Sequence, residues 1–421
     1  MNSLEIGKIT EKNGKVEIPI HYNNVTFDIW YKFPKKYNLH PQLANGVAAL
    51  SMIPAMKSGT DLVIKDGSIS NKLIEGLNTA QDILMKWYPR DLSKINIVAE
   101  KTKSAHTQKK DAQKKMVIAC FTGGVDSFDT LLRNQDEITH LLYIHGYDIP
   151  LKETAFRKKV SAHLQTVAKK FNKELIEVET NAREFTDHIG NEYWGSYFYG
   201  PAIASVALML AGDAAKLLVP SCQSYADLSP RASHVLLDHL WSVEDMEVVY
   251  DGAESSRTEK VAHISDNPIV QEHLRVCWQT KDAYNCSRCE KCVRTMVSLE
   301  LFDNLSRTKT FTSNLDYDHI AHTELDNDAT FAMAKDSLEI ARQRNKSDLI
   351  RALEIQTTNY SSAKLFNQLN DNFDLLVSSK DFGKIKDRLA NHLWQHYTKS
   401  MAKAGVDAST KKVVNKLRKL R

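Results

Sequence analysis

The sequence predicts an α/β fold: a doubly wound parallel sheet with a small N-terminal α+β module, a four-cysteine metal site and a helical C-terminal region. Between residues 116 and 302, short continuous apolar runs alternate with helical stretches. This is the pattern of a parallel sheet covered by helices on both faces. From residue 303 to residue 421, apolar residues recur almost wholly at helical spacing.

The N-terminal module is predicted over residues 1–100. Alternating polar and apolar residues predict strands over Val16–Ile20 and Val25–Trp30, with Asn23-Asn24 as the turn of a hairpin. Apolar residues at helical spacing predict a helix over Ser70–Trp87. We therefore expect a small mixed module ahead of the main sheet.

The main sheet is predicted over residues 116–302 from five short apolar runs, which are Met116–Phe121, Leu141–Ile144, Leu175–Val178, Leu217–Val219 and Met246–Val249. Helices are predicted between them over Glu153–Phe171 and Pro201–Ala211. Ligands of such sheets bind at the carboxyl ends of the strands, so the residues after the first run are candidates for a site. In the C-terminal region, the predicted helices are Ala341–Ile355, Ala363–Leu376 and Phe382–Met401.

Length and composition are those of a globular protein. At 421 residues, 42% hydrophobic and 26% charged, the chain is long enough for one large domain with additions or for two to three domains. No apolar run reaches the roughly 18 residues of a membrane-spanning helix, and the first residues do not resemble a signal peptide. We therefore expect a cytoplasmic protein without a membrane partner.

Basic residues are concentrated in two segments. Residues 101–115 are rich in lysine and lack apolar periodicity, which predicts a linker, and residues 411–421 form a basic tail. The net charge of +4 is too small to indicate nucleic-acid binding by itself. Both segments could contact phosphates of a nucleic acid, but solvated and disordered segments are the interpretation that we favour.

A candidate phosphate loop follows the first predicted strand and consists of Thr122, Gly123, Gly124, Val125, Asp126 and Ser127. Adjacent glycines let backbone N–H groups approach an anion, and the following helix contributes the positive end of its dipole. The hydroxyls of Thr122 and Ser127 can donate to phosphate oxygens. A carboxylate in an anion site requires a cation between them, so Asp126 suggests Mg²⁺. The alternative is a tight turn before a helix capped by Asp126 or Ser127.

This loop resembles the Ser-Gly-Gly-x-Asp-Ser signature of the PP-loop superfamily, the N-type ATP pyrophosphatases, with Thr122 in place of the first serine. The resemblance implies an enzyme that cleaves ATP between the α and β phosphates and attaches AMP to a substrate oxygen. It implies ATP and Mg²⁺ as cofactors. It also implies that the loop binds the phosphates, with Asp126 and Ser127 taking part in catalysis.

Cys277, Cys286, Cys289 and Cys292 are spaced as ligands of one metal ion. Two overlapping Cys-x-x-Cys turns and one upstream cysteine can arrange four thiolates as a tetrahedron around Zn²⁺. Such a site leaves no open position, so its role would be structural. An iron–sulfur cluster uses the same four ligands, and disulfides are disfavoured in the cytoplasm.

The same cysteine spacing downstream of a PP-loop resembles 7-cyano-7-deazaguanine synthases. In the segment Ser256–Val261, Arg257 stands in place of that family's lysine and Glu259 in place of its glutamate. The resemblance implies that Arg257 is catalytic and that Lys260 helps to bind ATP, because cations here would neutralise the phosphates. A solvated helix face is the alternative for both. The segment His145-Gly146-Tyr147, together with Glu153, resembles that family's Tyr-Gly-Gln segment and the glutamate after it, but this match is weaker.

The chain departs from this family where the family binds its substrate. An Arg-Asn pair is missing from Tyr197–Pro201, and Ser224–Asp227 matches the family's later acidic segment only loosely. The aromatic residues are Tyr193, Trp194, Tyr197, Phe198 and Tyr199. They could stack on a flat heterocycle, although such a cluster is more often core. Two further residues, His234 and Asp238, could line a pocket or cap a helix.

The sequence and its resemblance together imply an ATP-dependent ligase that adenylates a carboxylate, as on a 7-deazaguanine, for attack by ammonia or a macromolecular amine. The expected partners are a deazaguanine-like small molecule and a protein acceptor, within a homo-oligomer or complex. Queuosine biosynthesis and antiviral defence are both compatible with this chemistry. The alternatives are a tRNA-modifying PP-loop enzyme, which would bind nucleic acid, and a non-catalytic ATP-binding interaction protein.

Overall fold

The computed structural model describes residues 3–103, 116–190, 194–278, 283–312 and 314–377. The chain forms two compact units, Met1–Asn314 and Leu315–Arg421, each of which is described by itself. The predicted linker 101–115 lies outside the described residues from residue 104 onward.

The N-terminal hairpin is confirmed. Strand β3 (Lys15–Tyr22) pairs antiparallel with β4 (Val25–Lys32). The turn residues Asn23 and Asn24 have φ values of 49° and 61°, as a type I′ hairpin turn requires. The predicted helix is α2 (Asn71–Trp87), and the Ser70 side chain caps it by accepting from the Leu73 N–H.

The parallel part of the sheet is also confirmed. Its strands are β7 (Met116–Cys120), β8 (His140–His145), β9 (Glu174–Thr180), β10 (Ala214–Pro220) and β11 (Glu247–Asp251). They pair in the order β11-β10-β7-β8-β9, all parallel. The chain runs outward from β7 through β8 to β9 and then returns to β10 on the other side of β7. The carboxyl ends of β7 and β10 therefore flank the switch point, where sheets of this kind bind ligands.

The sheet is mixed rather than wholly parallel, which corrects the sequence prediction. Strand β9 pairs antiparallel with β4, so the N-terminal strands continue the main sheet. Beyond β4 and β3 the order continues with β1 (Ser3–Ile6), β5 (Asp61–Ser70) and β6 (Ile97–Lys103), while β2 (Thr10–Lys12) pairs with β3. This pairing satisfies the backbone groups of β9 that an open edge would expose.

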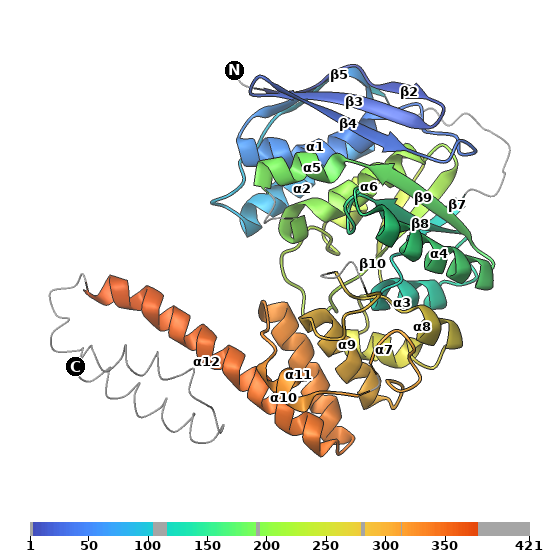
Figure 1. The fold of residues 1–421 in the computed structure, drawn as a ribbon. Helices are drawn as coiled ribbons and strands as arrows, with labels where there is room; N and C mark the ends of the chain where they lie inside the picture. The colour runs from blue at the N-terminus through green and yellow to red at the C-terminus, as the bar shows by residue number, and fades with distance from the viewer. Residues whose placement is uncertain (1–2, 104–115, 191–193, 279–282, 313, 378–421) are drawn as a thin grey trace. The chain divides into compact units, whose positions relative to one another are not determined.

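Helices cover both faces of the parallel strands (Figure 1). Helices α3 (Val125–Arg133) and α4 (Thr154–Lys170) connect strands that follow one another outward from β7. The return crossover contains α5 (Ala182–Gly190) and α6 (Tyr199–Met209), and a right-handed connection in the opposite direction places it on the other face. Helix α6 packs there against the buried helix α1 (Ala44–Ser58).

Within the described residues of the first unit, three α-helices follow β11. They are α7 (Arg257–Ile264), α8 (Pro268–His273) and α9 (Glu290–Leu301). Helix α7 contacts both α3 and α9, while α8 contacts α4. Helix α7 thus links α3, which follows the glycine loop, to α9, which carries the last of the four cysteines.

The described part of the second unit, up to residue 377, is helical, with α10 (Tyr317–His322), α11 (Asp328–Gln343) and α12 (Ser347–Val377). The predicted helix Ala341–Ile355 is wrong, because the chain breaks between α11 and α12, where Asn345 has a φ of 54°. Asparagine tolerates this left-handed conformation and often ends helices. The predicted helix Ala363–Leu376 lies within α12, and Phe382–Met401 lies outside the described residues.

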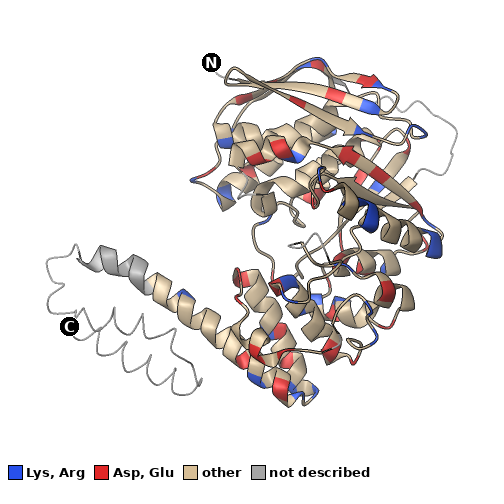
Figure 2. Ribbon diagram, in the orientation of Figure 1, with Lys and Arg blue, Asp and Glu red and all other residues tan. Residues whose placement is uncertain are grey.

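The described residues show neither a separation of charge by sign in the first unit (Figure 2) nor a membrane-spanning helix. Basic and acidic residues are interspersed over the ribbon of the first unit rather than separated by sign (Figure 2). None of the helices in the described ranges combines the length and apolar character needed to cross a membrane.

Helix α6 packs closely against the loop at Ala232, and this contact lets us predict the effect of a substitution on stability. A Cβ added to Gly200 would lie 1.9 Å from the Ala232 carbonyl oxygen, whereas nothing lies within 4 Å of one added to Gly195. Although alanine favours helix, we expect Gly200→Ala to lower the free energy of unfolding by about 2–4 kcal/mol through overpacking. The control Gly195→Ala should change it by no more than about 0.5 kcal/mol. Urea unfolding of both variants tests this, and equal stabilities would contradict the close packing.

Candidate functional site

The glycine loop lies at the switch point of the sheet, directly after β7. Gly123 has a φ of 76°, a conformation that side chains with a Cβ rarely adopt. Gly124 is extended and is the N-cap residue of α3. The loop therefore turns the chain sharply from a buried strand into a helix whose N-terminus lies at the carboxyl edge of the sheet.

Backbone N–H groups at the start of α3 are available to a ligand. The first helical hydrogen bond runs from the Phe128 N–H to the Gly124 carbonyl oxygen, at 2.9 Å. Across the described residues, no backbone carbonyl accepts from the N–H groups of Val125, Asp126 or Ser127. Such groups, together with the helix dipole, form an anion site.

Side chains of the loop contribute unequally. Thr122 is exposed, whereas Val125 is fully buried and can offer a ligand only its N–H group. Ser127 is buried, and its hydroxyl donates to the Gly124 carbonyl oxygen at 3.0 Å. This bond stabilises the turn and gives Ser127 a structural role beside any contact with phosphate.

The structure brings Asp126, Arg257 and Lys260 together. Arg257 Nη1 donates to Asp126 Oδ2 at 2.5 Å, and Lys260 Nζ lies 3.9 Å from Asp126 Oδ1. Burial alone would raise the pKa of Asp126, but the cations of Arg257 and Lys260 outweigh it and hold that pKa below its usual value. The two cations are buried, so the solvated helix face considered from the sequence is wrong for both.

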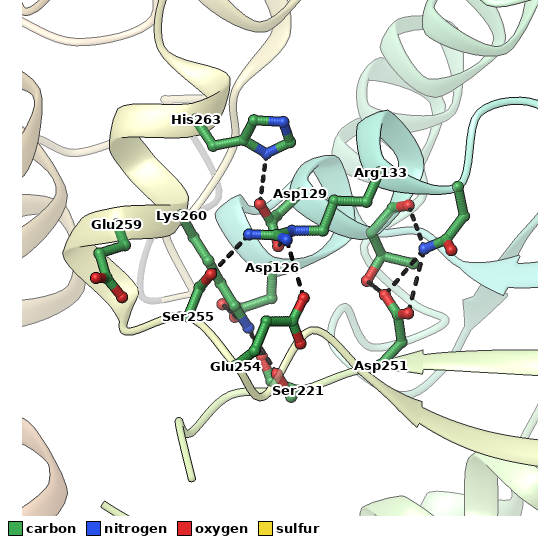
Figure 3. A network of polar contacts seen from close by, with 12 residues as sticks. Asp126, Asp129, Arg133, Ser221, Asp251, Glu254, Ser255, Glu259, Lys260 and His263 are labelled. Atoms are coloured by element: carbon green, nitrogen blue, oxygen red, sulfur yellow. Dashed lines mark hydrogen bonds and ion pairs between the residues drawn. The ribbon is translucent and has the colours of Figure 1, made fainter. Parts of the chain in front are cut away.

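Lys260 also ties α7 to the sheet. Its Nζ donates to the carbonyl oxygen and the hydroxyl of Ser221, at 2.7 and 2.6 Å, just beyond the end of β10. Figure 3 shows Lys260 between Asp126 and Ser221. This lysine thereby links the two loops that flank the switch point.

A second network, which the sequence reasoning missed, fastens α3 to α7 (Figure 3). Asp129 is fully buried and accepts from Arg133 Nε at 2.9 Å, and it lies 2.7 Å from His263 Nδ1. Arg133 also donates to Glu254 and Ser255. The i,i+4 spacing of Asp129 and Arg133 could have indicated that one ion pair, but the contacts with His263, Glu254 and Ser255 join segments more than 120 residues apart in the sequence.

Glu259 takes no part in the site. Its carboxylate accepts from the Ser256 N–H while the Ser256 hydroxyl accepts from the Glu259 N–H, which is a capping box at the start of α7. Figure 3 shows its side chain pointing away from Asp126 and Lys260. Its position in the family resemblance is thus explained by helix capping.

The four predicted cysteine ligands form a cluster. The sulfur atoms of Cys277, Cys286, Cys289 and Cys292 all lie within 4.8 Å of one another. The Cys277–Cys289 and Cys286–Cys292 sulfur pairs are 3.9 and 3.8 Å apart. A tetrahedron with Zn–S bonds of about 2.3 Å has edges of about 3.8 Å, whereas a disulfide bond is about 2.05 Å long. The cluster could therefore hold a zinc ion, and the disulfide alternative does not apply.

Backbone geometry supports the cluster. Ser287 has a φ of 57°, which folds the chain so that the N–H groups of Arg288 and Cys289 point at the Cys286 sulfur, at 3.5 and 3.2 Å. Donors of this kind stabilise a thiolate. Helix α9 starts at Glu290, directly after Cys289, and carries Cys292 on its first turn.

The cysteine cluster positions cations near the loop. Lys291 and Arg294, on the first turns of α9, are both close enough to Asp126 and Arg257 to interact electrostatically. Burial lowers the pKa of Lys291, and the Arg257 cation lowers it further. A metal that orders the start of α9 would thus also order the charges around Asp126.

Other segments from the sequence reasoning have structural roles. Tyr197 and Phe198 belong to the core, and the Tyr197 hydroxyl donates to Asp91 Oδ2 at 3.0 Å. Tyr193 lies outside the described residues. The Tyr147 hydroxyl donates to the Ala202 carbonyl oxygen at 2.9 Å, and His145 Nε2 lies 3.0 Å from Glu177 Oε1. The Tyr147 hydroxyl and His145 Nε2 are therefore both occupied by contacts within the protein.

His234 and Asp238 form a turn rather than a catalytic pair. Asp238 accepts from the His234 N–H at 3.2 Å and from the Ser233 hydroxyl at 2.6 Å. The carboxyl is almost fully buried, and burial raises the pKa of Asp238 to about 7. The short helix Asp238–Trp241 has Leu237 as its N-cap residue and no side-chain cap hydrogen bond, so these contacts stabilise a turn and do not cap a helix.

Comparisons of the chain with protein-family models, curated proteins and solved structures find no match. The structure itself shows an α/β fold with a large mixed sheet, a glycine loop at its switch point and a four-cysteine cluster.

Metal content tests the cysteine cluster. We expect one zinc ion per chain, because the four sulfurs match a tetrahedral site. Cys289→Ser should lose the metal and about 3 kcal/mol or more of unfolding free energy. Cys222→Ser, outside the cluster, should retain both. Elemental analysis and urea unfolding measure these outcomes, and iron in place of zinc, or no metal, would contradict the assignment.

Asp238 predicts a pH dependence. Its folded pKa of about 7 exceeds the unfolded value of about 3.9, so the folded state retains the proton through the interval between them. Stability contributed by this group is therefore highest below about pH 4, falls as the pH rises and is constant above about pH 7. Relative to Asp238→Asn, the wild type should lose unfolding free energy between pH 5 and pH 7. Urea unfolding across that range measures it, and parallel profiles would refute the raised pKa.

Proposed function

We propose that this protein is an ATP-dependent, AMP-forming enzyme that adenylates a carboxylate for attack by a nitrogen nucleophile. The observation that carries this proposal is the glycine loop at the switch point, with Asp126 held on it by Arg257 and Lys260. An acidic residue inside an anion site needs cations around it, and this one has two buried cations within 4.0 Å.

The residues of the site fit a nucleotide triphosphate. Three N–H groups at the start of α3 are open to phosphate oxygens, and Arg257 Nε is buried with no hydrogen-bond partner among the described residues. An unsatisfied guanidinium nitrogen is costly unless a ligand accepts from it. A bound phosphate would satisfy both sets of donors.

Asp126 fits a role in binding Mg²⁺ together with ATP. Its Oδ1 atom is buried and has no hydrogen-bond partner among the described residues. Because Arg257, Lys260 and Lys291 surround it, a bare divalent ion would be repelled, so the metal would enter with the phosphates that compensate its charge. Bound there, Mg²⁺ would neutralise charge on the phosphate oxygens.

The chain's own residues account for the proposed reaction. The loop amides hold the phosphates while a substrate carboxylate oxygen attacks the α-phosphorus, and the bond to the β-phosphate oxygen breaks to release pyrophosphate. Arg257 and Lys260 stabilise the negative charge that develops on the transferring group. A nitrogen nucleophile then attacks the acyl carbon, loses a proton and displaces AMP. Positioning and electrostatics supply the rate enhancement.

The proposed substrate is a 7-deazaguanine carboxylate, which rests on the resemblance to 7-cyano-7-deazaguanine synthases. The nucleophile is ammonia or an amine of a macromolecule. The proposed site would hold the carboxylate at the carboxyl ends of β7 and β10, next to the Asp126 group.

Turnover of labelled ATP tests this function. With Mg²⁺, ammonium and 7-carboxy-7-deazaguanine, we expect AMP and pyrophosphate to form only when the carboxylate is present. Asp126→Asn should lower the rate by about 100-fold or more, because it removes a charge that organises the site. Asp136→Asn changes an exposed carboxylate and should leave the rate unchanged.

Two outcomes would contradict the proposal. ADP and phosphate as products would mean cleavage at another bond. AMP formation that is unaffected by Asp126→Asn would mean that the chemistry does not use this loop. ATP binding without any turnover would instead support a non-catalytic nucleotide-binding protein.

A further inference from the structure

Arg275 is a buried cation in the segment that precedes Cys277. Its side chain is 5% exposed, and its Nε atom has no hydrogen-bond partner within the described residues. In that same part of the chain, no carboxylate lies within ion-pair distance of its guanidinium. Burying a guanidinium without a partner for its charge opposes folding. Such a group indicates a missing anion.

The glycine loop lies directly against Arg275. The Arg275 N–H donates to the Gly123 carbonyl oxygen at 2.7 Å. A Cβ added to Gly124 would lie 3.5 Å from the Arg275 carbonyl oxygen, so the two segments are in van der Waals contact. The position of Arg275 is thereby fixed relative to the loop amides rather than set by a flexible surface segment.

Tyr143, on β8, is a second buried polar group, and it interacts electrostatically with Arg275. It is 1% exposed, and no described residue forms a hydrogen bond with its hydroxyl. Burial raises the pKa of Tyr143, while the nearby Arg275 guanidinium opposes that rise. The phenol therefore stays protonated at neutral pH and can donate one hydrogen bond.

Aromatic contact limits the directions from which an anion can approach. The Arg275 guanidinium lies 5.5 Å from the centre of the Phe156 ring, which belongs to α4. A ring over a guanidinium leaves the in-plane N–H groups available, and these bind a phosphate through paired hydrogen bonds. Arg275 thus borders the glycine loop with an unsatisfied donor, and Tyr143 is close enough to Arg275 to interact with its charge.

We propose that Arg275 and Tyr143 form a subsite for the terminal phosphates of the nucleotide, the part that leaves as pyrophosphate. This inference rests on the proposed function. Arg257 and Lys260 contact Asp126 at the start of α3, whereas Arg275 contacts the preceding residue pair, Gly123 and Gly124. A triphosphate lying along the loop would therefore meet cations at both ends, with Arg275 on the pyrophosphate.

Pyrophosphate binding tests the subsite without turnover. Calorimetry with Mg²⁺ and inorganic pyrophosphate should show a loss of affinity of about 10- to 100-fold in Arg275→Met and a smaller loss in Tyr143→Phe. Affinity for AMP should not change. Arg307→Met, which removes an exposed cation, serves as the control for net charge and should bind pyrophosphate as the wild type does.

The stability of the Arg275→Met variant shows whether Arg275 binds a ligand or serves only to stabilise the fold. Removing an uncompensated buried charge should leave the urea midpoint of Arg275→Met unchanged or higher when no ligand is present. A lower midpoint with unchanged pyrophosphate affinity would overturn the inference, and so would equal losses for AMP and pyrophosphate.

The two proposals can fail separately. If no AMP forms in turnover assays but Arg275→Met still weakens pyrophosphate binding, the subsite stands and the adenylation chemistry fails. If AMP forms and Arg275→Met binds pyrophosphate normally, the adenylation stands and the subsite is wrong.

Discussion

The ion pair between Asp126 and Arg257 is the contact on which the candidate site depends. It joins α3 to α7 across 131 residues of sequence, and Lys260 extends the connection to Ser221 beyond β10. A buried ion pair is favourable only with good geometry and satisfied neighbours. Here the pair fixes the Asp126 carboxylate next to the glycine loop. The backbone N–H of Arg275 donates to the Gly123 carbonyl oxygen and fixes the loop at a second point. The loop is therefore held in one shape before any ligand arrives.

Charge around this pair is unbalanced. Arg257, Lys260, Lys291 and Arg294 all act on Asp126, and Arg275 adds a further buried cation beside the loop, whereas Glu290 pairs with Arg294. Excess positive charge in a buried region opposes folding, and natural proteins retain such features mainly where a ligand compensates them. The cysteine cluster fits this arrangement, because a metal there would order the start of α9 and so hold two of these cations in place.

Local signals in the sequence predicted the parts of the site that are continuous in the chain. The apolar run before Thr122, the two glycines and the helix after them predicted the strand, loop and helix that form the candidate site. The spacing of the four cysteines predicted their clustering, since each Cys-x-x-Cys turn brings its ligands together locally. The hairpin turn at Asn23-Asn24 was predictable because asparagine tolerates positive φ.

Contacts between distant segments were not predictable. The pairing of β4 with β9, which makes the sheet mixed, depends on register between strands about 150 residues apart. The roles of Asp129 and Arg275 arise from how α3, α7 and the segment before Cys277 pack, and neither residue stands in a recognisable motif. Glu259 shows the reverse: it matches a family motif in sequence, but the structure uses it to cap a helix.

Crystallography of the protein with Mg²⁺ and a non-hydrolysable ATP analogue tests the central claim, that residues 122–127 bind the triphosphate. The expected result is phosphate density against the N–H groups of Gly124 to Ser127, with the metal between Asp126 and the phosphates. An analogue bound elsewhere at saturating concentration, with no phosphate on this loop, would contradict it.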